Sequence, residues 1–188
     1  DERTMREIYL ASFESMVKKA KPWTMMGAYN KLNGTYLCEN KLILTDILRD
    51  EWGFDGYVMT DWGAMNDRVD GLKAGCELEM PSMSDRTDKE IIAAVEAGQL
   101  DEAVLDQAVE RFLNIVFKYV DNRDESAVFD READHQVARE LAEESSILLK
   151  NQEHILPLKA DQKVAFIGQY AQAPRYQGGG SSHINSFK

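Results

Sequence analysis

The sequence predicts an α/β protein whose strands run parallel. Short apolar stretches alternate with longer segments of helical periodicity, an order typical of parallel strand–helix units. Glycines bound the strand-like stretch at residues 56–62, as expected where a strand begins and ends. Hydrophobic residues make up 44% and charged residues 29% of the chain, the balance of a globular protein rather than a disordered one.

The first helix is expected to begin at Thr4, because Thr4 and Glu7 have the spacing of a capping box. Apolar residues then recur at helical spacing: Met5, Ile8, Tyr9, Phe13, Met16, Val17 and Ala20. The apolar run at residues 23–29 is short and leads to Asn33-Gly34, a pair typical of turns. A strand is therefore predicted there.

Two further strand–helix units are expected. Residues 42–52 have helical periodicity, and Gly53 ends that helix in the left-handed position. Residues 56–62 predict a second strand, residues 66–74 a short helix, and residues 77–80 a short third strand.

A helical region follows. Thr87 and Glu90 have capping-box spacing and open a helix that Gly98 ends, and Asp101 caps the next helix. That helix has an apolar stripe: Leu105, Ala108, Val109, Phe112, Ile115, Val116 and Tyr119.

The end of the chain predicts a separate unit. Residues 121–131 are polar and irregular, typical of a linker, and residues 134–149 predict another helix. Residues 163–168 predict a buried strand. The abrupt ends favour a piece of a longer protein, with tag removal and a disordered tail as the alternative.

Three strands before the linker are too few to form a sheet alone, because both edges would stay unpaired. We therefore expect them to belong to a larger sheet or barrel. The isolated chain is expected to form a homo-oligomer through its exposed edges.

Composition excludes several classes of partner. The net charge of −11 argues against nucleic acid and against an anionic membrane surface. No apolar run approaches the roughly 20 residues that cross a bilayer. Cys38 and Cys76 are too few for a disulfide scaffold and suit a reducing compartment, which predicts a cytoplasmic location. A single disulfide between them stays open.

Asp61 is the strongest candidate for chemistry. It ends a predicted buried strand, where active sites of barrels and open α/β sheets lie. A carboxylate there can serve as nucleophile, metal ligand or general base, and the neighbouring Trp62 can support a sugar ring. The alternative is that Asp61 is only the N-cap of the following helix.

Other candidates are weaker. Glu77 and Glu79 point to one face of the third strand, where a carboxylate pair can do acid/base work or make structural hydrogen bonds. The histidines and cysteines show no zinc-ligand spacing, and the glycine run at 178–180 lacks a phosphate-binding pattern. No metal and no cofactor are expected.

Residues 47–64, with the sequence ILRDEWGFDGYVMTDWGA, resemble the signature of the family-three glycoside hydrolases, the β-glucosidase-like enzymes. Supporting stretches run along the whole chain: residues 1–10, 26–30 with 33–34, 74–75 with 79–81, and 145–151 with 156–158. The resemblance implies three parts. Residues 1–120 are the C-terminal portion of a TIM-like (β/α)8 barrel, 121–158 a linker with a helix, and 159–188 the start of an α/β sandwich domain.

The resemblance also implies a function. Asp61 matches the nucleophile of retaining β-glycosidases that hydrolyse terminal β-D-glucosyl or related residues of glycosides and oligosaccharides. Met26, Tyr29 and Trp62 match positions that line the sugar subsite. The family's acid/base glutamate lies beyond Lys188, so the isolated chain is expected to be inactive.

Two departures and several alternatives remain. Glu77 stands where many members have Asp, and Gly179 where some have a serine. A noncatalytic carbohydrate-binding or assembly module stays open. So do a β-xylosidase and a β-N-acetylhexosaminidase of the same family.

Overall fold

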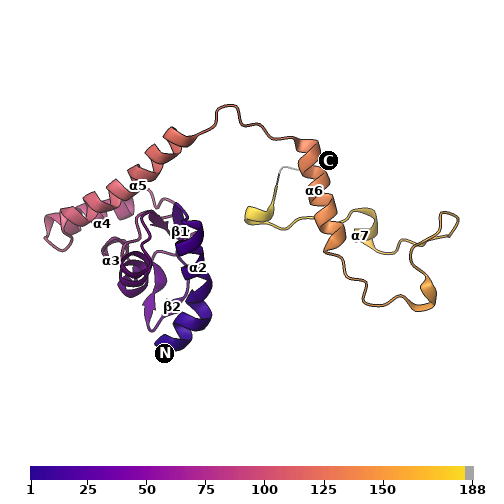
Figure 1. The fold of residues 1–188 in the computed structure, drawn as a ribbon, viewed down its shortest axis with the longest axis horizontal. Coiled ribbons are helices and arrows are strands. Elements are labelled where there is room, and N and C mark those ends of the chain that lie inside the picture. Colours follow the sequence, from indigo (N-terminus) through magenta and orange to yellow (C-terminus); the bar gives the residue numbers. More distant parts are fainter. Residues whose placement is uncertain (185–188) are drawn as a thin grey trace. The chain divides into compact units, whose positions relative to one another are not determined.

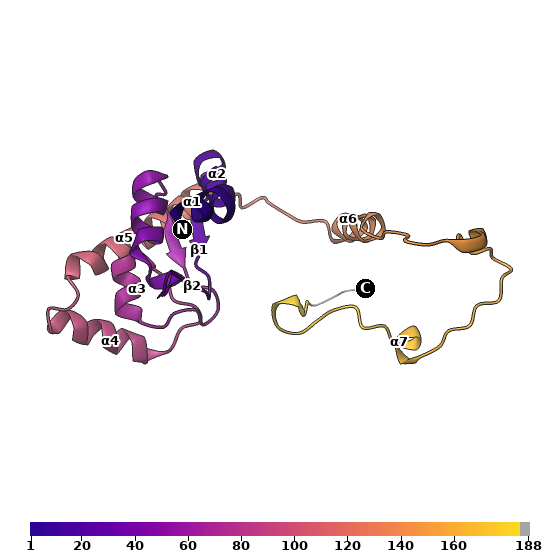
Figure 2. The ribbon, with the colours of Figure 1, turned by 90° about the horizontal axis from the view of Figure 1, so that it is seen from below.

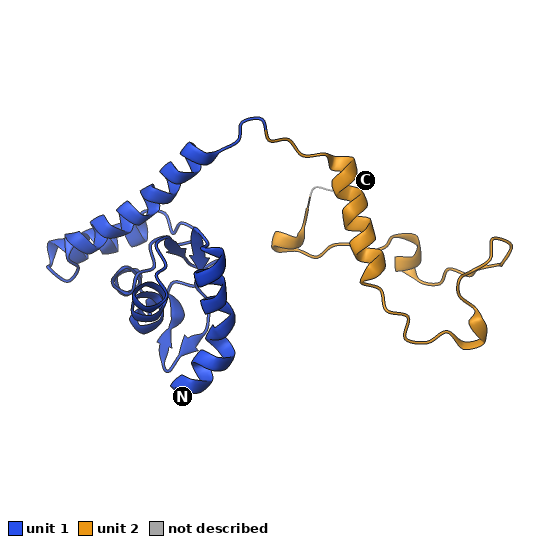
Figure 3. Ribbon diagram, in the orientation of Figure 1, with its two compact units in different colours: residues 1–126 blue, residues 127–188 orange. Residues whose placement is uncertain are grey.

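The computed structural model describes residues 1–184. The chain falls into two units, Asp1–Ser126 and a second unit that begins at Ala127 (Figure 3). Every strand of the described residues lies in unit 1, whereas unit 2 consists of short helices and irregular chain.

One continuous helix opens unit 1. It runs through α1 (Glu2–Thr4), the π-helical η1 (Met5–Leu10) and α2 (Ala11–Ala20). The Asp1 carboxylate accepts a hydrogen bond from the Thr4 N–H at 2.9 Å and caps this helix. The predicted cap at Thr4 is therefore wrong, because Thr4 already has helical backbone angles.

A parallel strand pair lies at the centre of unit 1. Strand β1 (Thr24–Met26) pairs with β4 (Tyr57–Met59), with Met25 opposite Val58. Helix α2 lies beside β1 in both views (Figures 1 and 2). The parallel pairing confirms the α/β class predicted from the alternation of strands and helices.

A hairpin follows β1. Strands β2 (Lys31–Leu32) and β3 (Thr35–Tyr36) pair antiparallel around the turn predicted at Asn33 and Gly34. The φ angles of these two residues are 49° and 93°, the left-handed conformation that a tight hairpin turn requires at both positions.

Two helices pack against the strand pair, the 3₁₀ turn η2 (Leu37–Glu39) and the π-helical η3 (Leu42–Glu51). Gly53 follows η3 with a φ of 77°, which confirms the predicted helix end. The main core cluster consists of Met5, Val17, Cys38, Ile43, Leu44, Ile47, Leu48, Trp52, Phe54, Val58, Ala64, Ala74 and Cys76.

Three helices follow β4: α3 (Arg68–Ala74), α4 (Asp85–Glu96) and α5 (Glu102–Asn122). They share a second, smaller core cluster of Leu72, Ala94, Leu100 and Ala108.

The starts of these helices test two predicted caps. Asp101 accepts a hydrogen bond from the Ala103 N–H at 3.0 Å and caps α5, as predicted. The predicted cap at Thr87 is wrong, because α4 begins at Asp85 and Thr87 is buried inside the helix.

The third strand predicted at residues 77–80 is reduced to one parallel bridge between Met59 and Leu78. The Leu78 N–H donates to the Val58 carbonyl at 3.1 Å, and the Thr60 N–H donates to the Leu78 carbonyl at 2.9 Å. The segment therefore lies beside β4 in the predicted direction, but it pairs over a shorter length than a strand.

Unit 2 contains α6 (Arg131–Glu144), η4 (Gln152–His154), α7 (Gln169–Gln172) and η5 (Gly180–Ser182). The helix predicted over 134–149 thus begins earlier and ends earlier. Asp130 caps α6, accepting from the Glu132 N–H at 3.0 Å. Within residues 1–184, no helix is both long enough and apolar enough to cross a bilayer.

The strand predicted at residues 163–168 is wrong for the described chain, where this segment is irregular. Its apolar side chains face solvent: Phe166 is 79% and Ile167 89% exposed. A strand needs a neighbour to satisfy its backbone N–H and C=O groups, and no described segment pairs with this one.

Candidate active site

The carboxyl ends of β1, β4 and the segment beside β4 meet at one edge. The Gly27 N–H donates to the Met59 carbonyl at 2.7 Å, and the Asp61 N–H donates to the Gly27 carbonyl at 3.2 Å. The Gly63 N–H donates to the Met80 carbonyl at 2.7 Å. Backbone hydrogen bonds thus fix residues on either side of Asp61 at the strand ends, where active sites of parallel α/β folds lie.

The Asp61 carboxylate is half-buried and points into a tight turn. One of its oxygens accepts the Trp62 N–H at 2.5 Å, and the Ala64 N–H donates to the Asp61 carbonyl at 3.0 Å. The following helix, α3, is capped by Asp67, which accepts from the Asp70 N–H at 2.9 Å. The interpretation of Asp61 as the cap of that helix is therefore wrong.

Tyr29 joins Asp61 and Trp62 from the loop after β1. Its hydroxyl donates to the Trp62 carbonyl at 2.7 Å. Desolvation, followed by the hydrogen bond and the charge of Asp61, raises the pKa of the Tyr29 phenol. The phenol therefore stays protonated at neutral pH and can donate a hydrogen bond beside the carboxylate.

Trp62 and Met26 present apolar surface at the same edge. Trp62 is 65% exposed, next to Asp61, so its indole is free to contact a ligand. Met26 ends β1 and is also exposed, and it lines an apolar pocket beside Leu10 and Phe13. Hydrogen bonds thus link Tyr29 to Trp62 and Trp62 to Asp61, whereas Met26 shares only the strand end.

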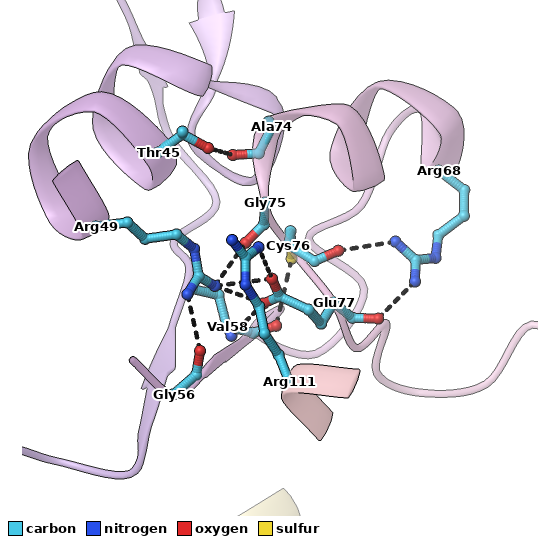
Figure 4. Close-up of polar contacts among 10 residues, drawn as sticks. All are labelled: Thr45, Arg49, Gly56, Val58, Arg68, Ala74, Gly75, Cys76, Glu77 and Arg111. Carbon is cyan, nitrogen blue, oxygen red and sulfur yellow. Dashed lines mark hydrogen bonds and ion pairs between the residues drawn. The ribbon is translucent and has the colours of Figure 1, made fainter. Parts of the chain in front are cut away.

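Glu77 and Glu79 do not form a reactive pair. The Glu77 side chain is 1% exposed and accepts hydrogen bonds from Arg49, from Arg111 and from the Val58 N–H. Glu79 is 4.0 Å from Arg68 and 11% exposed. The structural interpretation of Glu77 is confirmed, since both of its carboxylate oxygens are engaged by partners on a neighbouring strand and two helices (Figure 4).

The two cysteines, Cys38 and Cys76, belong to the main core cluster. Both are free thiols and fully buried, and the Cys38 thiol donates to the Ala28 carbonyl at 3.8 Å. The hydrogen bond to Cys38 and burial raise the pKa of the Cys76 thiol. A Cβ built on Gly27 would lie 2.5 Å from the Cys38 sulfur, so the strand end needs a glycine there.

The sequence interpretation missed Arg49 and Arg111. Both lie among the apolar positions of their helices. An arginine on such a face indicates a buried acidic partner, because charged side chains are rarely buried unless they are paired. No group of three or more His, Cys, Asp or Glu side chains suited to a metal ion occurs in the described part of the chain.

Two family models match this chain. The Glycosyl hydrolase family 3 N terminal domain matches residues 1–115, and the Glycosyl hydrolase family 3 C-terminal domain matches residues 146–188.

Similar proteins agree with this match. The chain is 55% identical over 184 residues to thermostable beta-glucosidase B of Acetivibrio thermocellus, covering 98% of the chain and 24% of that protein. It is 47% identical over 200 residues to an exo-alpha-(1->6)-L-arabinopyranosidase of Bifidobacterium longum, covering 99% and 26%. The chain thus spans about a quarter of the length of the curated relatives it matches.

Solved structures show the same fold. The GH3 beta-glucosidase of Bifidobacterium adolescentis matches with a TM-score of 0.82 and 45% identity, over 100% of this chain and 27% of that one. Beta-glucosidase 3B of Thermotoga neapolitana, in complex with alpha-D-glucose, matches with a TM-score of 0.84 and 39% identity, over 100% and 27%.

Proposed function

The chain belongs to glycosyl hydrolase family 3, and from this premise we propose that it carries the nucleophile, Asp61, of a retaining β-glycosidase. The observation that supports this most is the placement of Asp61: a half-buried carboxylate at the carboxyl end of β4, beside a hydroxyl donor and not spent on capping a helix. A nucleophilic carboxylate needs this combination of a fixed position, access to the substrate and a nearby hydrogen-bond donor.

In the proposed reaction an Asp61 oxygen attacks the anomeric carbon and forms a glycosyl ester while the bond to the leaving oxygen breaks. A proton from a second carboxyl group neutralises the leaving oxygen. Water, deprotonated by that same group, then attacks the anomeric carbon and releases Asp61. Glu77 is not this second carboxyl, because its oxygens are paired with Arg49 and Arg111. We assign no residue of this chain to that role.

The neighbours of Asp61 receive binding roles in this proposal. Tyr29 donates a hydrogen bond near the nucleophile, and the exposed face of Trp62 packs on the sugar ring. Met26 contributes apolar surface at the rim. These roles need no metal and no cofactor.

The substrate class is a glycoside or oligosaccharide with a terminal β-D-glucosyl residue. The beta-glucosidases among the relatives, and the glucose in a similar structure, support it. The L-arabinopyranosidase relative supports a second candidate, a terminal L-arabinopyranosyl residue, since it is 47% identical to this chain. Comparing the corresponding aryl glycosides as substrates of the complete protein distinguishes the two.

The test is covalent trapping with a 2-deoxy-2-fluoro aryl β-glucoside, followed by intact-mass and peptide-mass measurement. The complete protein that contains this chain is expected to gain one fluoroglucosyl group on Asp61. Asp61→Asn should gain none, and Asp55→Asn, an exposed aspartate at the other end of β4, should label normally. Sugar binding without any label would support the noncatalytic module instead, and a label on another residue would overturn the assignment.

The isolated chain is proposed to be inactive towards glycosides, because none of its residues is assigned as the second carboxyl. We also propose that it forms a homo-oligomer through the unpaired edges of the β1–β4 sheet. The apolar residues Ile8, Tyr9 and Phe13, which are 69%, 68% and 45% exposed on the first helix, support this self-association. Hydrolysis of an aryl β-glucoside by the isolated chain would contradict the first statement. A monodisperse monomer in light scattering would contradict the second.

A cytoplasmic location is proposed on the two free thiols, Cys38 and Cys76, which suit a reducing compartment. Recovery of the protein outside the cells that make it would contradict this location.

A further inference from the structure

Four successive backbone carbonyls, from the last residue of α3 onward, accept hydrogen bonds from side chains (Figure 4). Thr45 donates to the Ala74 carbonyl at 2.9 Å, and Arg49 donates to the Gly75 carbonyl at 3.3 Å. Arg68 donates to the next two carbonyls, at 3.0 and 2.7 Å. Within residues 77–80, only Leu78 makes both backbone hydrogen bonds to the β4 side, while the Met80 N–H donates to the Thr60 hydroxyl. The segment therefore forms a bridge and not a strand.

The Glu77 side chain replaces one of those acceptors. In a parallel pairing centred on Met59 and Leu78, the Val58 N–H would donate to the Cys76 carbonyl, but Arg68 occupies that carbonyl. The Val58 N–H donates instead to the Glu77 carboxylate, at 2.6 Å. A side-chain oxygen thus completes the hydrogen bonding of the strand that leads to Asp61.

Two arginines from different helices fix that carboxylate. Arg49 of η3 lies 2.8 Å from both Glu77 oxygens, and Arg111 of α5 lies 2.8 Å from one of them. Arg49 also donates to the carbonyl of Gly56, the residue directly before β4, at 2.8 Å. Burial lowers the pKa of Arg49, while the charge of Glu77 opposes that shift. The carboxylate therefore has one geometry, set by two arginines that are 28 and 34 residues from Glu77 in the sequence.

Further hydrogen bonds fix the register of the chain from Val58 to Asp61 against residues 78–80. The Thr60 N–H donates to the Leu78 carbonyl at 2.9 Å. The Thr60 hydroxyl donates to the Met80 carbonyl at 3.1 Å and accepts the Met80 N–H at 2.8 Å. Every residue between the Glu77 contact and Asp61 is thus tied to the adjacent segment or to β1.

We propose that Glu77, held by Arg111 and Arg49, is a positioning residue for Asp61: it sets the register of β4 and thereby the place of the Asp61 carboxylate. This proposal rests on the proposed function. A displacement of the order of 1 Å at a reacting group costs up to about a hundredfold in rate. Glu77 touches no substrate in this arrangement, and its effect passes through the backbone of three residues.

The test uses the complete protein, with 4-nitrophenyl β-glucoside for turnover and the 2-fluoro reagent to count competent sites. Arg111→Gln removes one partner of Glu77 from a position that is 24% exposed, so the fold is expected to survive. We expect kcat per competent site to fall about ten- to a hundredfold, with KM at the wild-type value. Arg111→Lys keeps the charge and should restore most of kcat.

Arg86→Gln is the matched control, since Arg86 pairs with Glu90 on the exposed face of α4 and should leave kcat unchanged. Glu77→Gln is a second variant, and it should lower kcat at least as much as Arg111→Gln. A lower melting temperature with wild-type kcat per competent site in Arg111→Gln and in any folded Glu77→Gln would overturn the positioning role. If instead the wild-type protein carries the fluoroglucosyl label on a residue other than Asp61, the proposed function itself fails.

Discussion

Two carboxylates of unit 1 are placed by strand β4, Asp61 after its end and Glu77 on the Val58 N–H, and their surroundings are opposite. Asp61 is half-buried at a strand end, where a backbone N–H and a tyrosine hydroxyl lie beside it. Glu77 is 1% exposed and bound by two guanidinium groups and a backbone N–H. A carboxylate with spare lone pairs and access to solvent can react, whereas one whose oxygens are all engaged in the interior can only hold structure.

The same difference appears in the partners. The contacts of the Asp61 carboxylate come from the next residue, Trp62, and from Tyr29 in the loop after the neighbouring strand. The contacts of Glu77 come from three separate elements, η3, β4 and α5. Loss of Asp61 should therefore be a local chemical event, and loss of Glu77 an event felt by the whole packing of unit 1.

The largest expected effect is on turnover, at Asp61. Replacing a nucleophile with its amide, as in Asp61→Asn, should lower kcat of the complete protein about 10⁴-fold, the scale seen when a member of a catalytic unit is removed. Stability should change little, because the amide oxygen can still accept the Trp62 N–H. Steady-state kinetics and thermal melting check both halves. Near-normal turnover would place the nucleophile elsewhere.

The next effect is on stability, at Glu77. Glu77→Gln leaves Arg49 and Arg111 without their buried counter-charge and should lower the free energy of unfolding by about 3–5 kcal/mol. Glu90→Gln, which breaks an exposed helix pair, should cost no more than about 0.5 kcal/mol. Chemical denaturation of the complete protein measures both. Equal, small losses for the two variants would erase the contrast between buried and exposed pairs.

A smaller effect is expected at Gly27, where the strand end rests on the core. A Cβ there would meet the Cys38 sulfur at 2.5 Å, so Gly27→Ala should cost about 1–3 kcal/mol through overpacking. The double variant Gly27→Ala with Cys38→Ala should recover most of that loss, since it removes the clashing atom. Additive losses in denaturation would show that the strain lies elsewhere.

Local signals predicted the parts of this site that depend on neighbouring residues. Gly53 ends its helix and Asp101 caps the next, because each acts on backbone groups within a few positions. The same holds for Asp61, which could be placed at a strand end from the glycines and apolar run around it. The caps at Thr4 and Thr87 were wrong because Asp1 and Ser84 precede them and the helices begin earlier.

Partners distant in sequence decided the rest. Whether residues 77–80 form a strand depends on which groups bind their backbone. Arg68 binds the Glu77 carbonyl, and the Thr60 hydroxyl, from 20 residues earlier in the sequence, binds the Met80 N–H and carbonyl. The segment 163–168 has the composition of a strand and lacks a described neighbour. Strand pairing is set by tertiary context, so composition alone overstates it.

The smallest expected effect is on the pKa of Tyr29, which should respond to Asp61 and not to Glu77. Desolvation and then Asp61 raise the pKa of Tyr29 above its unfolded value, so the resulting stability is present below the unfolded pKa and is lost as pH rises through the folded one. In Asp61→Asn one cause disappears and the pKa of Tyr29 should fall. In Arg111→Gln, which disturbs Glu77 only, it should stay raised unless the register of β4 has moved Asp61 away from Tyr29. Alkaline ultraviolet titration, taken as a difference from Tyr29→Phe, isolates this phenol from the other tyrosines. An unchanged pKa in Asp61→Asn would mean that desolvation alone holds it, and that the two side chains are electrostatically independent.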